Sequence, residues 1–379
     1  MSESTELNLF RDSIKKFLDK EVKPHYEQWE KDEIFPRNLW NMFGENGFLA
    51  VDTPEEDGGF GAPFEYSTVV VEELAKAGYG ALTSSVSVHS DIVTPYVQHL
   101  GSAEQKAYWL PKMISGEAVG AIAMTEPGAG SDLQGMRTSA RKDGDEYIIS
   151  GSKTFITNGQ HADLVIVAAK TDPNAGAKGI TLFLVDTTLP GFVRGRNLEK
   201  LGLHCGDTSE LFFEDVRVPE SAILGGLGKG FFNLMNELPR ERLILGVSSV
   251  AACEGMLDWT IEYVNERQAF GQSLAQFQNT RFKLAELKTQ TEVNKSFVAQ
   301  CKTQYEANEL DVPTAAMVKL STTELQGKVA DECLQLFGGY GYMMEYPIAR
   351  AFADARIQRI YGGTSEIMKE VVARSILGR

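Results

Sequence analysis

Cysteine, histidine and basic residues are scarce in this chain, and each scarcity excludes a class of protein. Four cysteines and five histidines occur among 379 residues, and no two cysteines form a C-x-x-C motif. A disulfide framework and a metal site are therefore not expected, and the cysteines are expected to be reduced and mostly buried. Lysine and arginine number 37 against 52 acidic residues, which gives a net charge of −15. Nucleic-acid binding needs basic surfaces and is not expected either.

Long apolar runs and targeting signals are also missing. No run approaches the 18 apolar residues of a membrane-spanning helix, so no membrane span is expected. The first ten residues, MSESTELNLF, are neither a basic-then-apolar signal nor an arginine-rich transit peptide. The sequence therefore predicts a prokaryotic cytoplasmic protein, with enough hydrophobic residues (43%) for two or three domain cores.

The apolar pattern divides the chain into three parts. Residues 1–118 have helical periodicity, and residues 228–379 return to long helical segments whose spacing is typical of a four-helix bundle. Residues 119–227 instead contain short aliphatic and β-branched runs separated by turns, such as Asp143-Gly144. Short strands without intervening long helices predict an antiparallel sheet or barrel. The predicted fold class is α+β and mainly α, with helical, β and helical-bundle domains in that order.

The most informative stretch is IYGGTSEI at 360–367. Gly362 and Gly363 end a helix, Thr364 suits the N-cap of the next helix, and Glu366 lies in that helix's first turn. The result is a tight loop beside a helix N-terminus, which can receive a flat or anionic ligand. Taken alone, these residues favour an ordinary turn between two helices.

This stretch resembles the C-terminal signature of the acyl-CoA dehydrogenases, flavoproteins that desaturate acyl-CoA thioesters. Most members carry a catalytic Glu where this chain has Gly362, but the long-chain and isovaleryl subgroups take their base from elsewhere. The segment ELPRER at 237–242 resembles that of the long-chain subgroup. The resemblance implies that Glu241 is the base, that Arg242 helps to fix the bound acyl-CoA, and that Phe232 lines the substrate channel. Without it, Glu241 would be one acid in a charged helix start.

Further stretches resemble the family's cofactor-binding segments, namely MTEPGAGSD at 124–132, FITNG at 155–159, RQAFG at 267–271 and QLFGG at 335–339. Alone, they would be a turn, a core strand and two helix ends. The residues that the resemblance assigns to FAD are Met124, Thr125, Ser131, Phe155, Ile156, Thr157, Arg267, Phe270, Gln278, Gln335, Leu336, Gly338, Gly339, Thr364 and Glu366. Those assigned to the substrate are Ser131, Phe232, Arg242, Gly362 and Gly363. Phe155 departs from the family, which usually has Trp there, so an indole N–H donor is lost.

The resemblance covers essentially the whole chain and implies FAD-dependent α,β-dehydrogenation of acyl-CoA to trans-2-enoyl-CoA in fatty acid β-oxidation. In the family, the backbone N–H at the position of Gly362 donates to the thioester carbonyl, and reduced flavin passes its electrons to an electron-transfer flavoprotein. The segment 335–339 resembles one that completes a neighbouring subunit's FAD site, which implies a homo-oligomer, specifically a tetramer built as a dimer of dimers. Long or branched acyl chains are favoured by the subgroup resemblance alone, because no spacing in the sequence gives the depth of the pocket.

Other functions stay open at this point. An acyl-CoA oxidase that uses oxygen would share the fold, as would a nitroalkane oxidase, although the latter uses an Asp near the C-terminal loop that this chain lacks. A non-catalytic acyl-CoA-binding scaffold is a third alternative. A replacement base at Glu241, 121 residues before Gly362, argues against the scaffold because this spacing agrees with the family.

Overall fold

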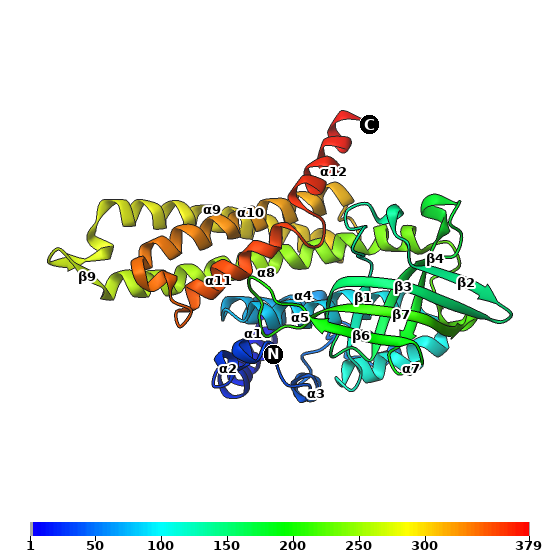
Figure 1. Ribbon diagram of the computed structural model, residues 1–379. Coiled ribbons are helices and arrows are strands. Elements are labelled where there is room, and N and C mark those ends of the chain that lie inside the picture. The colour runs from blue at the N-terminus through cyan, green and yellow to red at the C-terminus, as the bar shows by residue number, and fades with distance from the viewer. Residues whose placement is uncertain (1–2, 379) are drawn as a thin grey trace.

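The computed structural model describes residues 3–378, and its elements follow the predicted order of helices, strands and helices (Figure 1). Residues 1, 2 and 379, which include the predicted ends of the first and last domains, lie outside the described range. The predicted boundaries at 118/119 and 227/228 stay predictions. All four cysteines are buried and free.

The N-terminal part is built from helices joined by loops. Its helices are α1 (Glu3–Phe17), α2 (Tyr26–Asp32), α3 (Asn38–Glu45), α4 (Phe64–Lys76), α5 (Gly80–Ser87), α6 (Thr94–Leu100) and α7 (Ala103–Ile114), with π-helical turns η1 (Leu18–Val22) and η3 (Val88–Val93). Helix α7 begins with a reciprocal capping box formed by Ser102 and Gln105. The capped α7 is one of the two helices that α6 packs against in this part.

The middle part is one eight-stranded sheet. Its strands are β1 (Gly120–Ala123), β2 (Ser139–Asp143), β3 (Glu146–Thr157), β4 (Leu164–Lys170), β5 (Ile180–Asp186), β6 (Phe192–Asn197), β7 (Thr208–Pro219) and β8 (Ile223–Leu224), in the spatial order β6-β7-β3-β2-β4-β5-β8. Most pairs are antiparallel as predicted, but β1 runs parallel to β4 and pairs with it off this order. The parallel pair arises because β1 and β4 are separated by the β2–β3 hairpin rather than joined by a turn.

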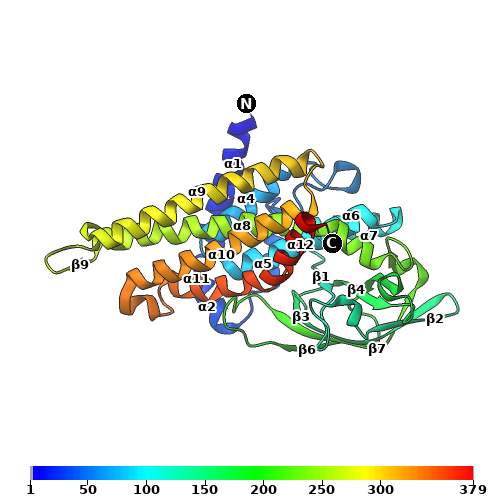
Figure 2. The ribbon, with the colours of Figure 1, turned by 90° about the horizontal axis from the view of Figure 1, so that it is seen from above.

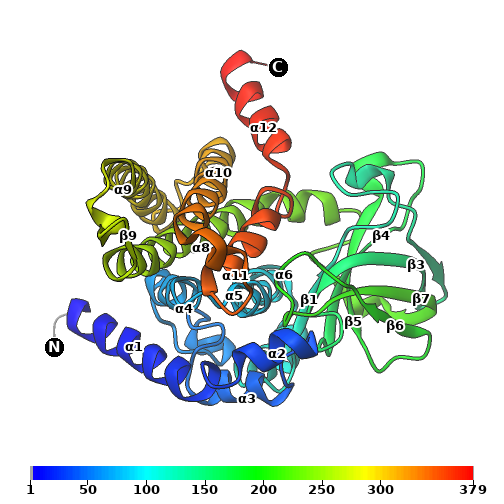
Figure 3. The ribbon, with the colours of Figure 1, turned by 60° about the vertical axis from the view of Figure 1, so that its left-hand side comes forward.

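The C-terminal part contains a bundle in which α8, α9, α10 and α11 lie side by side (Figures 2 and 3). Its elements are α8 (Gly230–Glu266), the hairpin strands β9 (Gln268–Ala269) and β10 (Gln272–Ser273), α9 (Gln278–Glu306), α10 (Val312–Phe337), α11 (Pro347–Ala355) and α12 (Ser365–Leu377). The predicted glycine stop is confirmed, since α10 ends at Phe337 immediately before Gly338. Helix α12 leaves the bundle and projects from it (Figure 1).

Helix α8 is the longest element and the one that the site depends on. Its 37 residues extend for about 55 Å, from the sheet at one end to the β9–β10 hairpin at the other (Figure 1). By length and composition, α8 could cross a membrane, but 67% of its most apolar window is buried inside the protein. Such burial is typical of a core helix, and the charged side chains within α8 would be costly in a membrane.

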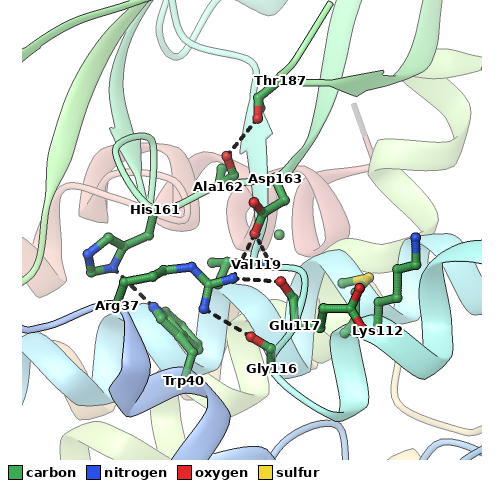
Figure 4. Close-up of polar contacts among 12 residues, drawn as sticks. Arg37, Trp40, Lys112, Gly116, Glu117, Val119, His161, Ala162, Asp163 and Thr187 are labelled. Carbon is green, nitrogen blue, oxygen red and sulfur yellow. Dashed lines mark hydrogen bonds and ion pairs between the residues drawn. The ribbon is translucent and has the colours of Figure 1, made fainter.

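Arg37 fastens the N-terminal helices to the sheet (Figure 4). Its guanidinium donates to the carbonyl oxygens of Gly116 and Glu117, at 2.9 and 2.7 Å, and to the carboxylate of Asp163 at 2.8 Å. The same carboxylate accepts the Val119 N–H at 2.9 Å, just before β1 begins. One side chain therefore connects the N-terminal helices with the starts of β1 and β4. This connection holds the N-terminal part and the sheet in a fixed relative position.

Candidate active site

Glu241 lies on α8 and is only 5% exposed. The phenol of Tyr96, on α6, donates a hydrogen bond of 3.0 Å to its Oε1. The pKa of Glu241 is raised to about 7, mainly by burial; the Tyr96 hydrogen bond and the charge of Arg242 oppose this shift, and the nearby charge of Glu237 adds to it. A carboxyl group with a pKa near neutrality is suited to act as a general base.

The C-terminal glycine loop packs on α8 one helical turn beyond Glu241. Gly362 and Gly363 have φ of 63° and 95°, the left-handed region that glycine adopts without strain. A Cβ placed on Gly362 would lie 2.5 Å from Cδ1 of Leu245, and the Nζ of Lys319 donates to the Gly363 carbonyl at 2.7 Å. Two motifs that are far apart in the sequence are therefore neighbours in the fold.

The loop presents backbone donors beside this position. In the described part of the chain, the N–H of Gly362 donates to no other group. The predicted N-cap is confirmed, since the Thr364 hydroxyl accepts from the Ile367 N–H at 3.3 Å, and Glu366 lies exposed in the first turn of α12. The loop thus has the free N–H that polarising a thioester carbonyl needs.

Arg242 is buried and incompletely paired. Within residues 3–378, its Nε and Nη1 are buried and have no hydrogen-bond partner. Burial lowers the pKa of this guanidinium, while the charge of Glu241 opposes that shift. Because an unpaired buried cation is costly, the arrangement favours a ligand with oxygen acceptors here, as acyl-CoA has.

The preceding residue, Arg240, was not singled out by the sequence. Its guanidinium donates to the carboxylates of Asp52 and Asp91, at 2.6 and 3.2 Å, and to the Tyr305 hydroxyl at 3.2 Å. These contacts tie the turn of α8 that carries Glu241 to the N-terminal helices and to α9. The only feature of the sequence that could have indicated these contacts is the presence of charged residues in an otherwise apolar helix.

Two of the predicted flavin-binding stretches lie side by side. The Thr154 N–H donates to the Thr125 carbonyl at 2.9 Å, and the Lys153 Nζ donates to the Met124 carbonyl at 3.0 Å. The loop that carries exposed Ser131 is thereby held against β3. The sequence predicted that both stretches lie in the β part. Only the folded sheet shows that they contact each other.

Phe155 is presented outward beside the C-terminal motif. A register shift between Lys153 and Ile156 takes it out of the β3–β7 ladder, its φ is 60°, and its side chain is 67% exposed, while Ile156 is buried. A cavity of about 320 Å³ opens at this point. Its lining includes Phe155, Thr157, Ile360 and Tyr361. An exposed aromatic ring beside a cavity is compatible with packing of a flat ring such as isoalloxazine.

Arg267, which the resemblance assigns to the FAD pyrophosphate, and the 335–339 segment, which it assigns to the adenine half, lie elsewhere. Arg267 follows the last residue of α8, and its guanidinium sits 5.5 Å from the centre of the Tyr340 ring, next to Gly338 and Gly339. Phe270, at the tip of the β9–β10 hairpin, is 97% exposed. In the same region Gln278 and Gln335 are exposed and Leu336 is half-buried.

The predicted FAD residues therefore form two groups, one where the sheet meets the glycine loop and the other around the β9–β10 hairpin, which lies at one end of the molecule (Figure 1). Glu241 and Arg267 are 26 residues apart on one helix, which corresponds to about 39 Å. Within one chain, Arg267 therefore lies far from the glycine loop that packs beside Glu241.

Phe232 is not brought beside Glu241. It is exposed in the first turn of α8, and a spacing of nine residues places it half a turn out of phase with Glu241. Its role in the substrate channel stays a prediction. Tyr96, which does contact Glu241, was missed, because the only signal was a tyrosine in an apolar segment.

A larger cavity, of about 600 Å³, lies between α1, α4, α8 and α9. Its rim carries charged side chains such as Arg11 and Glu73, and its floor is formed by residues such as Val247 and Val298. None of the predicted site residues lines it. Size alone therefore does not identify the active site of this protein.

Comparisons with known proteins agree with this geometry. Sequence profiles of the acyl-CoA dehydrogenase N-terminal, middle and C-terminal domains match residues 4–117, 121–216 and 228–377. A mitochondrial long-chain specific acyl-CoA dehydrogenase of Sus scrofa is 51% identical over 377 residues, covering 99% of this chain and 87% of that protein. A mitochondrial isovaleryl-CoA dehydrogenase of Solanum tuberosum is 36% identical, covering 97% of this chain and 89% of that protein.

A crystal structure of an acyl-CoA dehydrogenase from Geobacillus kaustophilus superposes with a TM-score of 0.96 at 48% identity, covering 99% of this chain and 98% of that one. The exposed Phe155 beside a cavity, the free N–H of Gly362 and the buried, unpaired Arg242 all fit a flavin and an acyl-CoA. The chain therefore belongs to the acyl-CoA dehydrogenase family and is an FAD-dependent oxidoreductase of acyl-CoA thioesters.

Proposed function

We propose that Glu241 is the base that removes the α-proton of a long or branched acyl-CoA. The observation that carries the proposal is the packing of the Gly362 loop on Leu245, one turn beyond Glu241, where most family members carry their base. Burial and a pKa near 7 support the role. The 51% identity to a long-chain enzyme supports the substrate class.

Each residue of the proposed site has its own role in the reaction. The Gly362 N–H donates to the thioester carbonyl, which stabilises the enolate that develops as the α-proton leaves. Glu241 accepts that proton, and its Tyr96 hydrogen bond fixes the carboxyl group. Arg242 orients the acyl-CoA. Bound FAD supplies the acceptor for the β-hydride.

Activity and substrate class are tested with the purified yellow protein under anaerobic conditions. Titration with a panel of acyl-CoAs of different lengths and branching should bleach the flavin, with long or branched chains acting fastest. Uniformly poor bleaching by long and branched chains would overturn the substrate assignment. Slow reoxidation in air, together with fast reoxidation by an electron-transfer flavoprotein, is expected of a dehydrogenase. Fast reoxidation in air alone would indicate an oxidase.

The wide separation of the two groups of predicted FAD residues supports a homo-oligomer, in which Arg267 and the 335–339 segment complete a neighbour's site. A tetramer built as a dimer of dimers is the proposed assembly. The predicted prokaryotic cytoplasmic location stays a prediction, since both curated relatives named above are mitochondrial.

Dilution tests the shared site. On dilution through the dissociation range, FAD release should follow subunit dissociation, because each separated subunit holds only one end of the cofactor. Sedimentation and flavin fluorescence, measured on the same dilution series, report the two events. Monomers that retain FAD with unchanged affinity would contradict the shared site.

Replacing Arg267 tests its predicted contact with the FAD pyrophosphate. Arg267→Ala should weaken FAD binding by roughly tenfold to a hundredfold, since a charge-assisted hydrogen bond contributes about 1.5–3 kcal/mol. FAD affinity is measured by titration of the apoprotein. Arg281→Ala, which removes a nearby arginine of α9, is the control. A normal titration of Arg267→Ala would refute the assignment.

A further inference from the structure

Two neighbouring polar contacts join α6 to α8. Tyr96 of α6 donates to Glu241 of α8, and three residues later on α6 the ring Nδ1 of His99 lies 3.0 and 3.1 Å from the two carboxylate oxygens of Glu237. Residues three and four apart on a helix are neighbours on one face. The two contacts are therefore adjacent, and Glu237 lies one helical turn from Glu241.

Exposure increases along this series of groups. Glu241 is 5% exposed, Glu237 is 8% exposed, and the His99 side chain is 41% exposed. The series thus begins at the buried proposed base and ends at the surface. Each pair of neighbouring groups is within hydrogen-bond reach or about one helical turn apart.

A buried base has a problem that a solvated base does not have. After one turnover Glu241 carries the substrate's α-proton, and it must lose that proton before the next turnover. Its hydrogen-bond partner Tyr96 is itself buried, and burial raises the pKa of that phenol well above its usual value. Tyr96 therefore stays protonated and holds Glu241 in place without providing a route to water.

We propose that Glu237 and His99 form the exit through which the α-proton leaves Glu241 for solvent. This inference rests on the proposed role of Glu241 as the base. The Glu241 carboxyl group loses the proton, the Glu237 carboxylate gains it and passes it to the His99 ring, and the exposed ring edge releases a proton to water. All three groups return to their starting charge, one proton moves outward, and no electrons are transferred.

The surrounding charges are compatible with this direction. Glu241 faces the charges of Glu237 and Arg242 and the phenol of Tyr96. On the neighbouring η3, Asp91 is already occupied by Arg240 and by the Ser67 hydroxyl. Glu237 and His99 thus remain the titratable pair that connects Glu241 with the surface on this side of α8.

The test separates removal of the proton from its exit. A 3-thiaacyl-CoA has sulfur at the β-position and cannot release a hydride, yet its α-proton can still be removed reversibly. When the holoenzyme holds this probe in D₂O, deuterium enters the α-position only if the removed proton leaves Glu241. Bleaching of the flavin by a saturated acyl-CoA, followed for a single turnover, requires removal of the proton but not its exit.

His99→Gln is the decisive variant, because glutamine can still donate an N–H to Glu237 but cannot carry a proton. We expect deuterium incorporation, followed by mass spectrometry, to slow by at least about tenfold, with single-turnover bleaching within about twofold of the parent. Imidazole added to His99→Ala should restore part of the exchange. Gln98→Ala, the adjacent residue on α6, is the matched control and should exchange normally.

The possible failures can be told apart. Normal exchange in His99→Gln would overturn the exit and leave the base assignment intact. Equal slowing of exchange and bleaching would also overturn it, because His99 would then only brace α6 against α8. Normal exchange in Glu241→Gln would instead refute the proposed base.

Discussion

Glu241→Gln is expected to abolish flavin bleaching by acyl-CoA and to leave the protein folded and yellow. The amide is nearly isosteric, and the predicted flavin contacts lie on other elements. General-base catalysis typically contributes about 10²–10⁴-fold, so the bleaching rate should fall by at least that factor. Anaerobic stopped-flow absorbance measures it, and Glu254→Gln, another partly buried glutamate of α8, is the matched control. Bleaching at the parent rate would show that Glu241 is not the base.

The pKa of Glu241 adds a pH signature to the same variant. Because only the carboxylate accepts a proton, bleaching by the parent protein should rise with pH through about 7. Stability should move the other way. Burial raises the folded-state pKa above the unfolded value, so the parent loses stability as pH rises from about 4.5 towards and past 7, by up to about 3 kcal/mol. Glu241→Gln lacks this loss, so its relative stability in denaturant titrations should increase with pH over that window.

Moving the base to the glycine loop should restore part of the activity that Glu241→Gly removes. Combining Glu241→Gly with Gly362→Glu places a carboxylate on the loop that packs on α8 one helical turn beyond position 241. Two obstacles are visible, namely a left-handed φ of 63° at position 362 and Cδ1 of Leu245 only 2.5 Å from the new Cβ. The φ alone costs of order 1–3 kcal/mol. The double variant should therefore recover little.

Adding Leu245→Ala removes the second obstacle, and the triple variant should bleach faster than the double variant. Recovery stays partial, because a misplacement of about 1 Å can cost on the order of 10²-fold. Short, straight acyl chains should benefit most, since the new side chain crowds bulky chains. Glu241→Gly with Leu245→Ala is the control. A triple variant that binds FAD yet bleaches with no substrate would show that positions 241 and 362 do not reach the same carbon.

Local patterns in the sequence were enough to predict the helices, most strands and the loop chemistry. Capping residues and paired glycines act over a few residues, so the start of α12 and the end of α10 could be read directly. Strand pairing is not local. The aliphatic run of β4 predicted a strand, whereas β1 was not singled out as one, and nothing in the sequence could show that the two run parallel.

The candidate site also contains residues that a local motif indicated and residues that only tertiary packing brings together. Glu241 was found through a motif, whereas Tyr96 and His99 are polar residues on a short helix more than 130 positions away. Their roles depend on which face of α6 packs on α8, and that is set by tertiary packing. The contact of Leu245 with the Gly362 loop likewise became visible only in the folded chain.

The distance of about 39 Å between Glu241 and Arg267 along α8 has a genetic consequence under the proposed assembly. A subunit with a substitution at Glu241 still contributes an intact Arg267 to the neighbouring site. A subunit with a substitution at Arg267 still has its own base. When two such alleles are expressed together, one of the two sites in each mixed pair inherits both defects and the other inherits neither. Two inactive genes would therefore complement each other, and their combined phenotype would not be the sum of the separate ones.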